Sequence, residues 1–123
     1  MESPTGITVR RAGIEDAATL AALGARTFAD AYRDQIPNDE LRRYVVHSFA
    51  PEQIRSELGA PGSTFLLAER ELDPVGYARL LKEALPGAGA DASGLRLVRI
   101  YVDHTLVRGG VGGLLIRACL EQA

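Results

Sequence analysis

The sequence is poor in the residues that mark several common kinds of site. It has no tryptophan, a single cysteine (Cys119) and two histidines (His47 and His104) among its 123 residues. One cysteine excludes an intrachain disulfide and a cysteine-based zinc site. The two histidines lie far apart in the sequence, so we expect no metal site.

Charge and hydrophobic runs exclude further classes of protein. The 14 basic and 16 acidic residues give a formal net charge of −2, without a block of one sign, whereas nucleic-acid-binding domains usually carry a basic stripe. No apolar run reaches the ~20 residues that a membrane helix needs. The N-terminal stretch MESPTGITVRR contains no apolar signal core. We therefore expect a cytoplasmic protein with no nucleic-acid or membrane partner.

The rest of the composition is that of one globular domain spanning residues 1–123. The hydrophobic fraction is 46% and the charged fraction 24%, close to the averages of folded soluble domains. The length suffices for one core, and no linker or internal repeat divides the chain. A single domain is therefore predicted.

Periodicity and turn residues predict the order strand, three helices, three strands and a final helix, which is an α/β class. Asn38 is expected to cap the second helix, and Pro51 suits the first turn of the third. A short polar link at 70–73 predicts a hairpin, and small residues predict a loop at 84–94. The strands are predicted at 7–12, 64–69, 74–81 and 95–102, and the helices at 14–33, 39–48, 51–58 and 114–121.

Four glycines lie within residues 107–115, between the last predicted strand and the last predicted helix. A helix N-terminus offers unpaired N–H groups and a partial positive charge, and glycines before it let a ligand approach the backbone. Phosphate sites are built in this way. A P-loop does not fit, because Leu114 stands where its lysine is needed, and a dinucleotide-binding fold needs a further strand. A glycine-rich turn without a ligand stays open as an alternative.

Residues 97–115, LVRIYVDHTLVRGGVGGLL, resemble the acetyl-CoA-binding motif of the GCN5-related N-acetyltransferase (GNAT) superfamily. The segment 100–103 matches the strand end of that motif, and 110–112 matches its Gly-x-Gly. The segment 76–78 (Gly-Tyr-Ala) resembles a step common in the third strand. The resemblance implies the GNAT fold, a mixed, mostly antiparallel sheet flanked by helices. It also implies acetyl transfer from acetyl-CoA to a primary amine of a small molecule.

The same resemblance assigns acetyl-CoA to named residues. The strand would offer its main chain to the pantetheine arm, chiefly at Ile100 and Val102, and the loop would hold the pyrophosphate. The Gln or Arg of the motif falls on Val107, so we expect Arg108 to reach a phosphate instead. A glutamate that serves many relatives as base falls at about Arg96, which cannot be a base, and no catalytic residue is assigned. The implied cofactor-binding residues are Ile100, Tyr101, Val102, Val107, Arg108, Gly109, Gly110, Val111, Gly112 and Gly113.

A narrower resemblance, to the bacterial spermidine/spermine N-acetyltransferase branch, implies a polyamine acceptor. It rests on the aromatic and polar residues of the helical region, namely Thr27, Phe28, Tyr32, Tyr44, Phe49, Glu52, Gln53, Glu57 and Leu58. Phe28 and Tyr32 are the expected substrate-binding residues. Tyr44 and Tyr77 are expected in the core, as is Cys119.

The superfamily normally continues beyond this motif with another strand, a helix bearing a tyrosine and a closing hairpin. We therefore expect a C-terminally incomplete GNAT fold. Because an open sheet edge invites association, a homodimer or a poorly behaved monomer is expected as well. The alternative function is a truncated or degenerate relative that binds acyl-CoA or a partner chain without catalysis.

Overall fold

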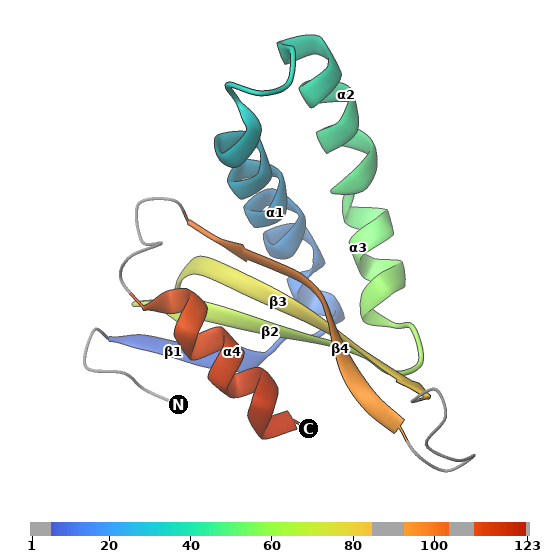
Figure 1. The fold of residues 1–123 in the computed structure, drawn as a ribbon, viewed down its shortest axis with the longest axis vertical. Coiled ribbons are helices and arrows are strands. Elements are labelled where there is room, and N and C mark those ends of the chain that lie inside the picture. The colour runs from blue at the N-terminus through green and yellow to red at the C-terminus, as the bar shows by residue number, and fades with distance from the viewer. Residues whose placement is uncertain (1–5, 85–92, 104–109, 123) are drawn as a thin grey trace.

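The structure, a computed structural model, describes residues 6–84, 93–103 and 110–122. Its elements follow the predicted order (Figure 1). The strands are β1 (Ile7–Arg11), β2 (Ser63–Arg70), β3 (Asp73–Ala84) and β4 (Ser93–Val102). The helices are α1 (Ala17–Tyr32), α2 (Asn38–Ser48), α3 (Pro51–Leu58) and α4 (Val111–Gln122), with a short 3-10 helix at Ile14–Asp16.

The four strands form one sheet in the order β1-β2-β3-β4, and each neighbouring pair is antiparallel. Helices α1 and α3 cover one face of the sheet, and α4 crosses the other (Figure 1). This arrangement confirms the predicted α/β fold with a mostly antiparallel sheet flanked by helices, and the described strands contain no parallel pair. No described helix is long and apolar enough to cross a membrane.

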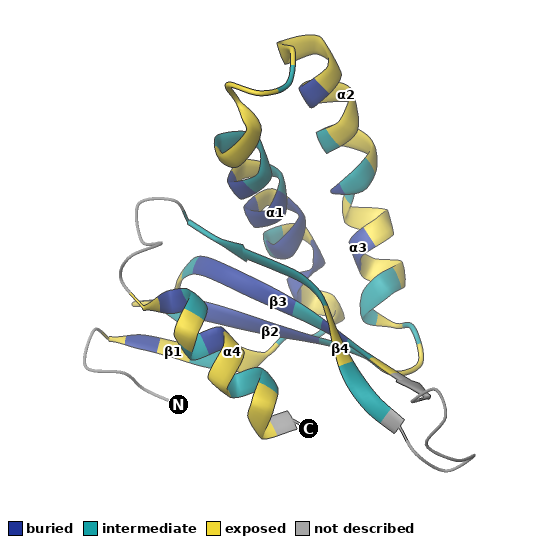
Figure 2. Ribbon diagram, viewed as in Figure 1, coloured by how far each residue is buried: buried dark blue, intermediate teal, exposed yellow. Residues whose placement is uncertain are grey.

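The apolar run of β2 is explained by burial on both faces of the sheet. Successive side chains of a strand point to opposite faces, so Phe65 and Leu67 join the cluster beneath α1 and α3. Leu66 and Ala68 join the cluster beneath α4. Strands covered on both sides read as continuous hydrophobic runs rather than alternating ones. Figure 2 shows the two central strands as the most buried part of the sheet.

Helix α4 begins three residues before its predicted start. Val111 and Leu115 are fully buried, one turn apart. A Cβ atom at Gly76 would lie 3.2 Å from the side chain of each, so this glycine of β3 lets the helix approach closely. Packing thus keeps Gly112 and Gly113 helical although glycine is a poor helix former.

Two other boundaries differ from the prediction. The cap assignment of Asn38 is wrong, because Leu41 N–H already donates to the Pro37 carbonyl oxygen at 2.9 Å and Asn38 lies inside α2. Strand β3 runs on to Ala84, at the start of the predicted loop. The predicted hairpin is confirmed, and its turn holds Glu71 and Leu72 at φ of 52° and 72°, a conformation that usually favours Asn and Gly.

Candidate functional site

Strand β4 is the last strand of the described sheet and contributes to both faces. Arg99 and Tyr101 face the side of α2 and α3. Ile100 and Val102 pack against the apolar cluster beneath α4. The alternation of a strand therefore separates two sets of side chains along one backbone.

The main chain of β4 alternates in the same way. Asp103 N–H donates to the Val75 carbonyl oxygen at 2.8 Å, so it points toward β3. Two residues earlier, the Tyr101 carbonyl oxygen lies 3.0 Å from where a Cβ of Gly76 would be, also toward β3. The N–H and C=O groups of Ile100 and Val102 must then point to the outer edge. Within residues 6–84, 93–103 and 110–122, no strand pairs with that edge.

The N-terminus of α4 lies beside the end of β4. The first intrahelical bond runs from Leu114 N–H to the Gly110 carbonyl oxygen, at 3.0 Å. The N–H groups of residues 111–113 therefore have no partner within the helix. Among the described residues, a Cβ atom at Gly112 would meet only the Val102 Cγ2 atom, at 4.0 Å, and one at Gly113 would meet nothing within 4 Å.

No close contact with the described residues therefore requires a glycine at position 112 or 113. Gly110, in contrast, is required by its φ of +87°. Of the predicted cofactor residues, Val107, Arg108 and Gly109 lie outside the described residues, as does His104.

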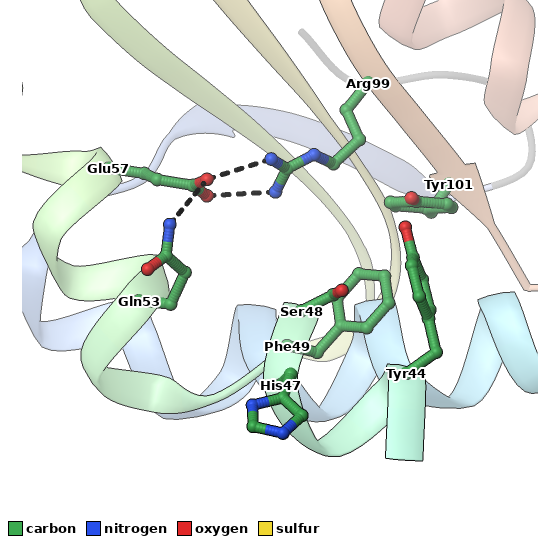
Figure 3. Close-up of a pocket in the computed structure, with 8 residues that line it drawn as sticks. All are labelled: Tyr44, His47, Ser48, Phe49, Gln53, Glu57, Arg99 and Tyr101. Carbon is green, nitrogen blue, oxygen red and sulfur yellow. Dashed lines mark hydrogen bonds and ion pairs between the residues drawn. The ribbon is translucent and has the colours of Figure 1, made fainter. Parts of the chain in front are cut away.

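A pocket of about 370 Å³ opens between α2, α3 and β4 (Figure 3). This volume lies in the ~300–1,000 Å³ range of small-molecule sites. Its residues combine aromatic rings with a charged pair, and they are Tyr44, His47, Ser48, Phe49, Gln53, Glu57, Arg99 and Tyr101.

The charged pair of this pocket joins α3 to β4. Both Nη atoms of Arg99 lie 2.9 Å from the Glu57 carboxylate, a bidentate geometry. Gln53 donates to the same carboxylate at 3.4 Å, and Arg79 Nη1 lies 3.6 Å from it. Burial raises the pKa of the Glu57 carboxyl, but Arg99 and Arg79 outweigh burial and hold that pKa below its ordinary value. Glu57 is therefore an ionised structural partner and a poor base.

An aromatic cluster forms the other wall of the pocket. The Phe28 ring centroid lies 4.6 Å from that of Tyr32 and 4.8 Å from that of Tyr44, and Phe49 meets Tyr101 edge-on at 5.5 Å. Phe28 and Tyr32, the predicted substrate-binding residues, are not among the lining residues and support the pocket through Tyr44. The core prediction for Tyr44 is wrong: its side chain is 50% exposed, because α2 buries only Leu41 within the helix.

The other tyrosine prediction is confirmed, since Tyr77 is fully buried. Burial raises the pKa of Tyr77 to about 12 and also raises the pKa of Tyr101, so both phenols stay neutral near pH 7. Cys119 is only half-buried against the α4 cluster, and burial raises the pKa of its thiol. Among the described residues, no three His, Cys, Asp or Glu side chains gather to hold a metal ion.

The pairing of Glu57 with Arg99 and Arg79 was not predicted. The partners lie 42 and 22 residues apart in sequence, on α3, β4 and β3. No local motif signals such a pairing. Only the alternation of β4, which places Arg99 on the same face as Tyr101, could have suggested a side chain directed at α3.

The structures of known proteins that superpose on this chain share its fold. No family model matches the sequence. An uncharacterised N-acetyltransferase of Lactobacillus delbrueckii subsp. lactis is 24% identical over 119 residues, which cover 96% of this chain and 68% of that protein. The crystal structure of the PaiA N-acetyltransferase of Thermoplasma acidophilum, in complex with coenzyme A, superposes with a TM-score of 0.76 at 18% identity. This match covers 94% of this chain and 70% of that one.

The chain has the GNAT fold. An aminoglycoside acetyltransferase from an uncultured soil metagenomic sample, crystallised with trehalose, is also similar, with a TM-score of 0.69 at 17% identity over 96% of this chain and 70% of that one. These matches show the fold, and membership of the GNAT superfamily stays a prediction. The spermidine/spermine branch within it stays a prediction.

Proposed function

We propose that this chain binds acetyl-CoA and directs its acetyl group to the primary amine of a small molecule. The observation that carries the proposal is the meeting of the β4 edge and the α4 N-terminus. The outward main-chain groups of Ile100 and Val102 lead to the unpaired N–H groups of residues 111–113, with Val102 beside Gly112. An extended amide chain followed by a pyrophosphate fits these two features in turn.

The roles of the described residues follow from this placement. Ile100 and Val102 pair with the amides of the pantetheine arm, while Tyr101 directs its ring to the acceptor pocket. The N–H groups near Gly110, Val111, Gly112 and Gly113 receive the pyrophosphate. Val107, Arg108 and Gly109 are proposed to extend this contact.

The acceptor enters from the other face of β4, through the pocket lined by Tyr44, Phe49 and Tyr101. Its amine nitrogen attacks the thioester carbonyl carbon, the C–N bond forms, and the C–S bond breaks. The amine proton leaves with the thiolate as a thiol. The protein contributes mainly the orientation of the two reactants. Neither Glu57, held in its ion pairs, nor the neutral phenols are assigned as the base.

A charge placed at the α4 N-terminus tests the proposal. A carboxylate in the first turn stabilises a helix but repels a phosphate bound there. Gly113→Asp is therefore expected to raise the melting temperature and weaken CoA binding roughly tenfold or more in calorimetry. Gly113→Ala is the matched control, because its Cβ meets none of the described residues within 4 Å, and it should raise stability without weakening binding.

Equal CoA affinity in the two variants would place the pyrophosphate elsewhere and overturn this part of the proposal. Acetyl transfer is followed by release of free thiol with a panel of amines that includes spermidine, the predicted polyamine acceptor. CoA binding without thiol release for any amine would identify a relative that binds acyl-CoA without catalysis. Light scattering tests the predicted homodimer.

A further inference from the structure

The charges beside the pocket do not balance. Two guanidinium groups, those of Arg79 and Arg99, meet one carboxylate, that of Glu57. The three side chains are only 13%, 20% and 13% exposed, respectively. In the described part of the chain, Glu57 is the only acid that pairs with these two arginines and the only acid lining the pocket. Glu57 and Arg99 line the pocket, whereas Arg79 is not among its lining residues. Together the three side chains carry one surplus, poorly solvated positive charge next to the pocket.

Arg79 is the source of the surplus. Its Nε donates to Ser63 Oγ at 3.2 Å, and its Cζ lies 5.7 Å from the Phe65 ring centroid. Its contact with Glu57 is longer, 3.6 Å, than the two 2.9 Å contacts that Arg99 makes. A guanidinium has five N–H donors. Arg79 therefore keeps donor capacity next to a carboxylate that Arg99 already engages through both oxygens.

We propose that the acceptor carries a carboxylate together with its amine, and an apolar body that lies against Phe49, Tyr44 and Tyr101. An amino acid with a large apolar side chain has this chemistry. The inference rests on the proposed acetyl transfer and names its acceptor class. The carboxylate is attracted by the surplus charge of the Arg79–Glu57–Arg99 triad, whereas a polyamine, which is cationic at neutral pH, is repelled by it.

The pocket walls agree with this acceptor. Tyr44, Phe49 and Tyr101 provide broad ring surfaces on one side, and Figure 3 shows the Glu57–Arg99 pair on the other. A ligand with an apolar part at one end and an anion at the other would match the two walls. Because the amine lies between them, it would be held at the β4 side of the pocket, where the thioester is proposed to run.

A matched pair of ligands isolates the carboxylate. Phenylalanine and phenethylamine differ only by that group, so their affinities are compared by calorimetry, both with saturating CoA and without it. We expect phenylalanine to bind roughly tenfold or more tightly, since hydrogen bonds to charged groups are the stronger ones. Equal binding of the two, tighter binding of phenethylamine or spermidine, or no binding of phenylalanine would overturn the inference.

Substitution of Arg79 provides a second test of the inference. Arg79→Gln should weaken phenylalanine binding and remove the preference for phenylalanine. Phenethylamine is a cation at neutral pH, so loss of the surplus positive charge should not weaken its binding. Arg42→Gln makes the same change of charge on the exposed part of α2 and should preserve the difference. CoA binding by each variant is measured in parallel. If wild type does not bind CoA, the result counts against the proposed function. If it binds CoA but does not distinguish phenylalanine from phenethylamine, the result counts against this inference alone.

Discussion

The two faces of the sheet are built for different purposes. The face beneath α4 is closed by aliphatic side chains, with Val111 and Leu115 fully buried against β2 and β3. The face beneath α1 and α3 carries aromatic rings, the Glu57–Arg99 pair and a pocket. One face thus fixes the position of the glycine-rich helix end, and the other leaves a hollow with polar groups. The first face is thus a closed apolar core, and the second is the face on which the pocket opens.

The largest loss of stability is expected when a buried side chain between α4 and the sheet is removed. Leu115→Ala deletes a fully buried side chain and should lower the free energy of unfolding by about 2–5 kcal/mol, measured in urea. Ile116→Ala, the next residue along the same helix, is 48% exposed in wild type and should change stability much less. Similar losses for both variants would contradict the assignment of α4 as a packed cover.

A glycine on the opposite face offers a different test. A Cβ at Gly24 of α1 would lie 2.6 Å from Phe49 Cδ1 and 2.9 Å from the Tyr77 hydroxyl oxygen. Gly24→Ala should therefore destabilise the fold by about 1–3 kcal/mol and displace Phe49, a pocket residue, with weaker acceptor binding. The control is Gly59→Ala, whose Cβ meets only ordinary contacts at 3.7 Å and beyond. Greater stability of Gly24→Ala than of wild type would show that Phe49 moves without cost.

The smallest effect is expected at the ion pair and depends on pH. The folded-state pKa of Glu57 lies below its unfolded value of about 4.3, so the pair stabilises the protein above that pH. This contribution disappears as the pH falls through the lower folded-state pKa. Glu57→Gln should lose about 1–2 kcal/mol at pH 7 and approach wild type at low pH, as measured by thermal unfolding at a series of pH values.

Asp16 also has a lowered pKa, because Arg10 binds its carboxylate at 2.9 and 3.0 Å. Protonation of Asp16 and protonation of Glu57 both destabilise the wild-type protein at low pH, and Glu57→Gln removes only the second effect. A wild-type advantage that persists unchanged at low pH would mean that the Glu57 carboxylate is not stabilised by the arginines.

The order of elements could be predicted because local rules acted without conflict. The β-branched and apolar runs of the strands, the helical spacing of α1 and Pro51 at the start of α3 all indicated the structure that forms. The start of α4 could not be predicted, since it depends on Val111 packing against Gly76 of another strand. Tertiary packing overrode the low helix propensity of glycine there.

The candidate site could be proposed from the sequence only where it follows a local motif. The strand end and the Gly-x-Gly segment pointed to the β4 edge and the α4 N-terminus. The pocket could not be found in this way, because Glu57 and Arg99 meet through the geometry of α3 and β4. Tyr44 shows the same limit: hydrophobicity favoured burial, but α2 turns most of its surface to solvent.

Strand β4 has a consequence for how such a protein can change over generations. At its C-terminal end, Arg99 and Tyr101 line the pocket, whereas Ile100 and Val102 are partly buried and pack against the α4 cluster. Substitutions of Arg99 and Tyr101 can therefore alter the pocket while the backbone edge and the core stay as they are. A single-residue insertion would exchange the two sets at once. Point substitution can thus change the pocket without disturbing the core, whereas a change of length in this strand would disturb both.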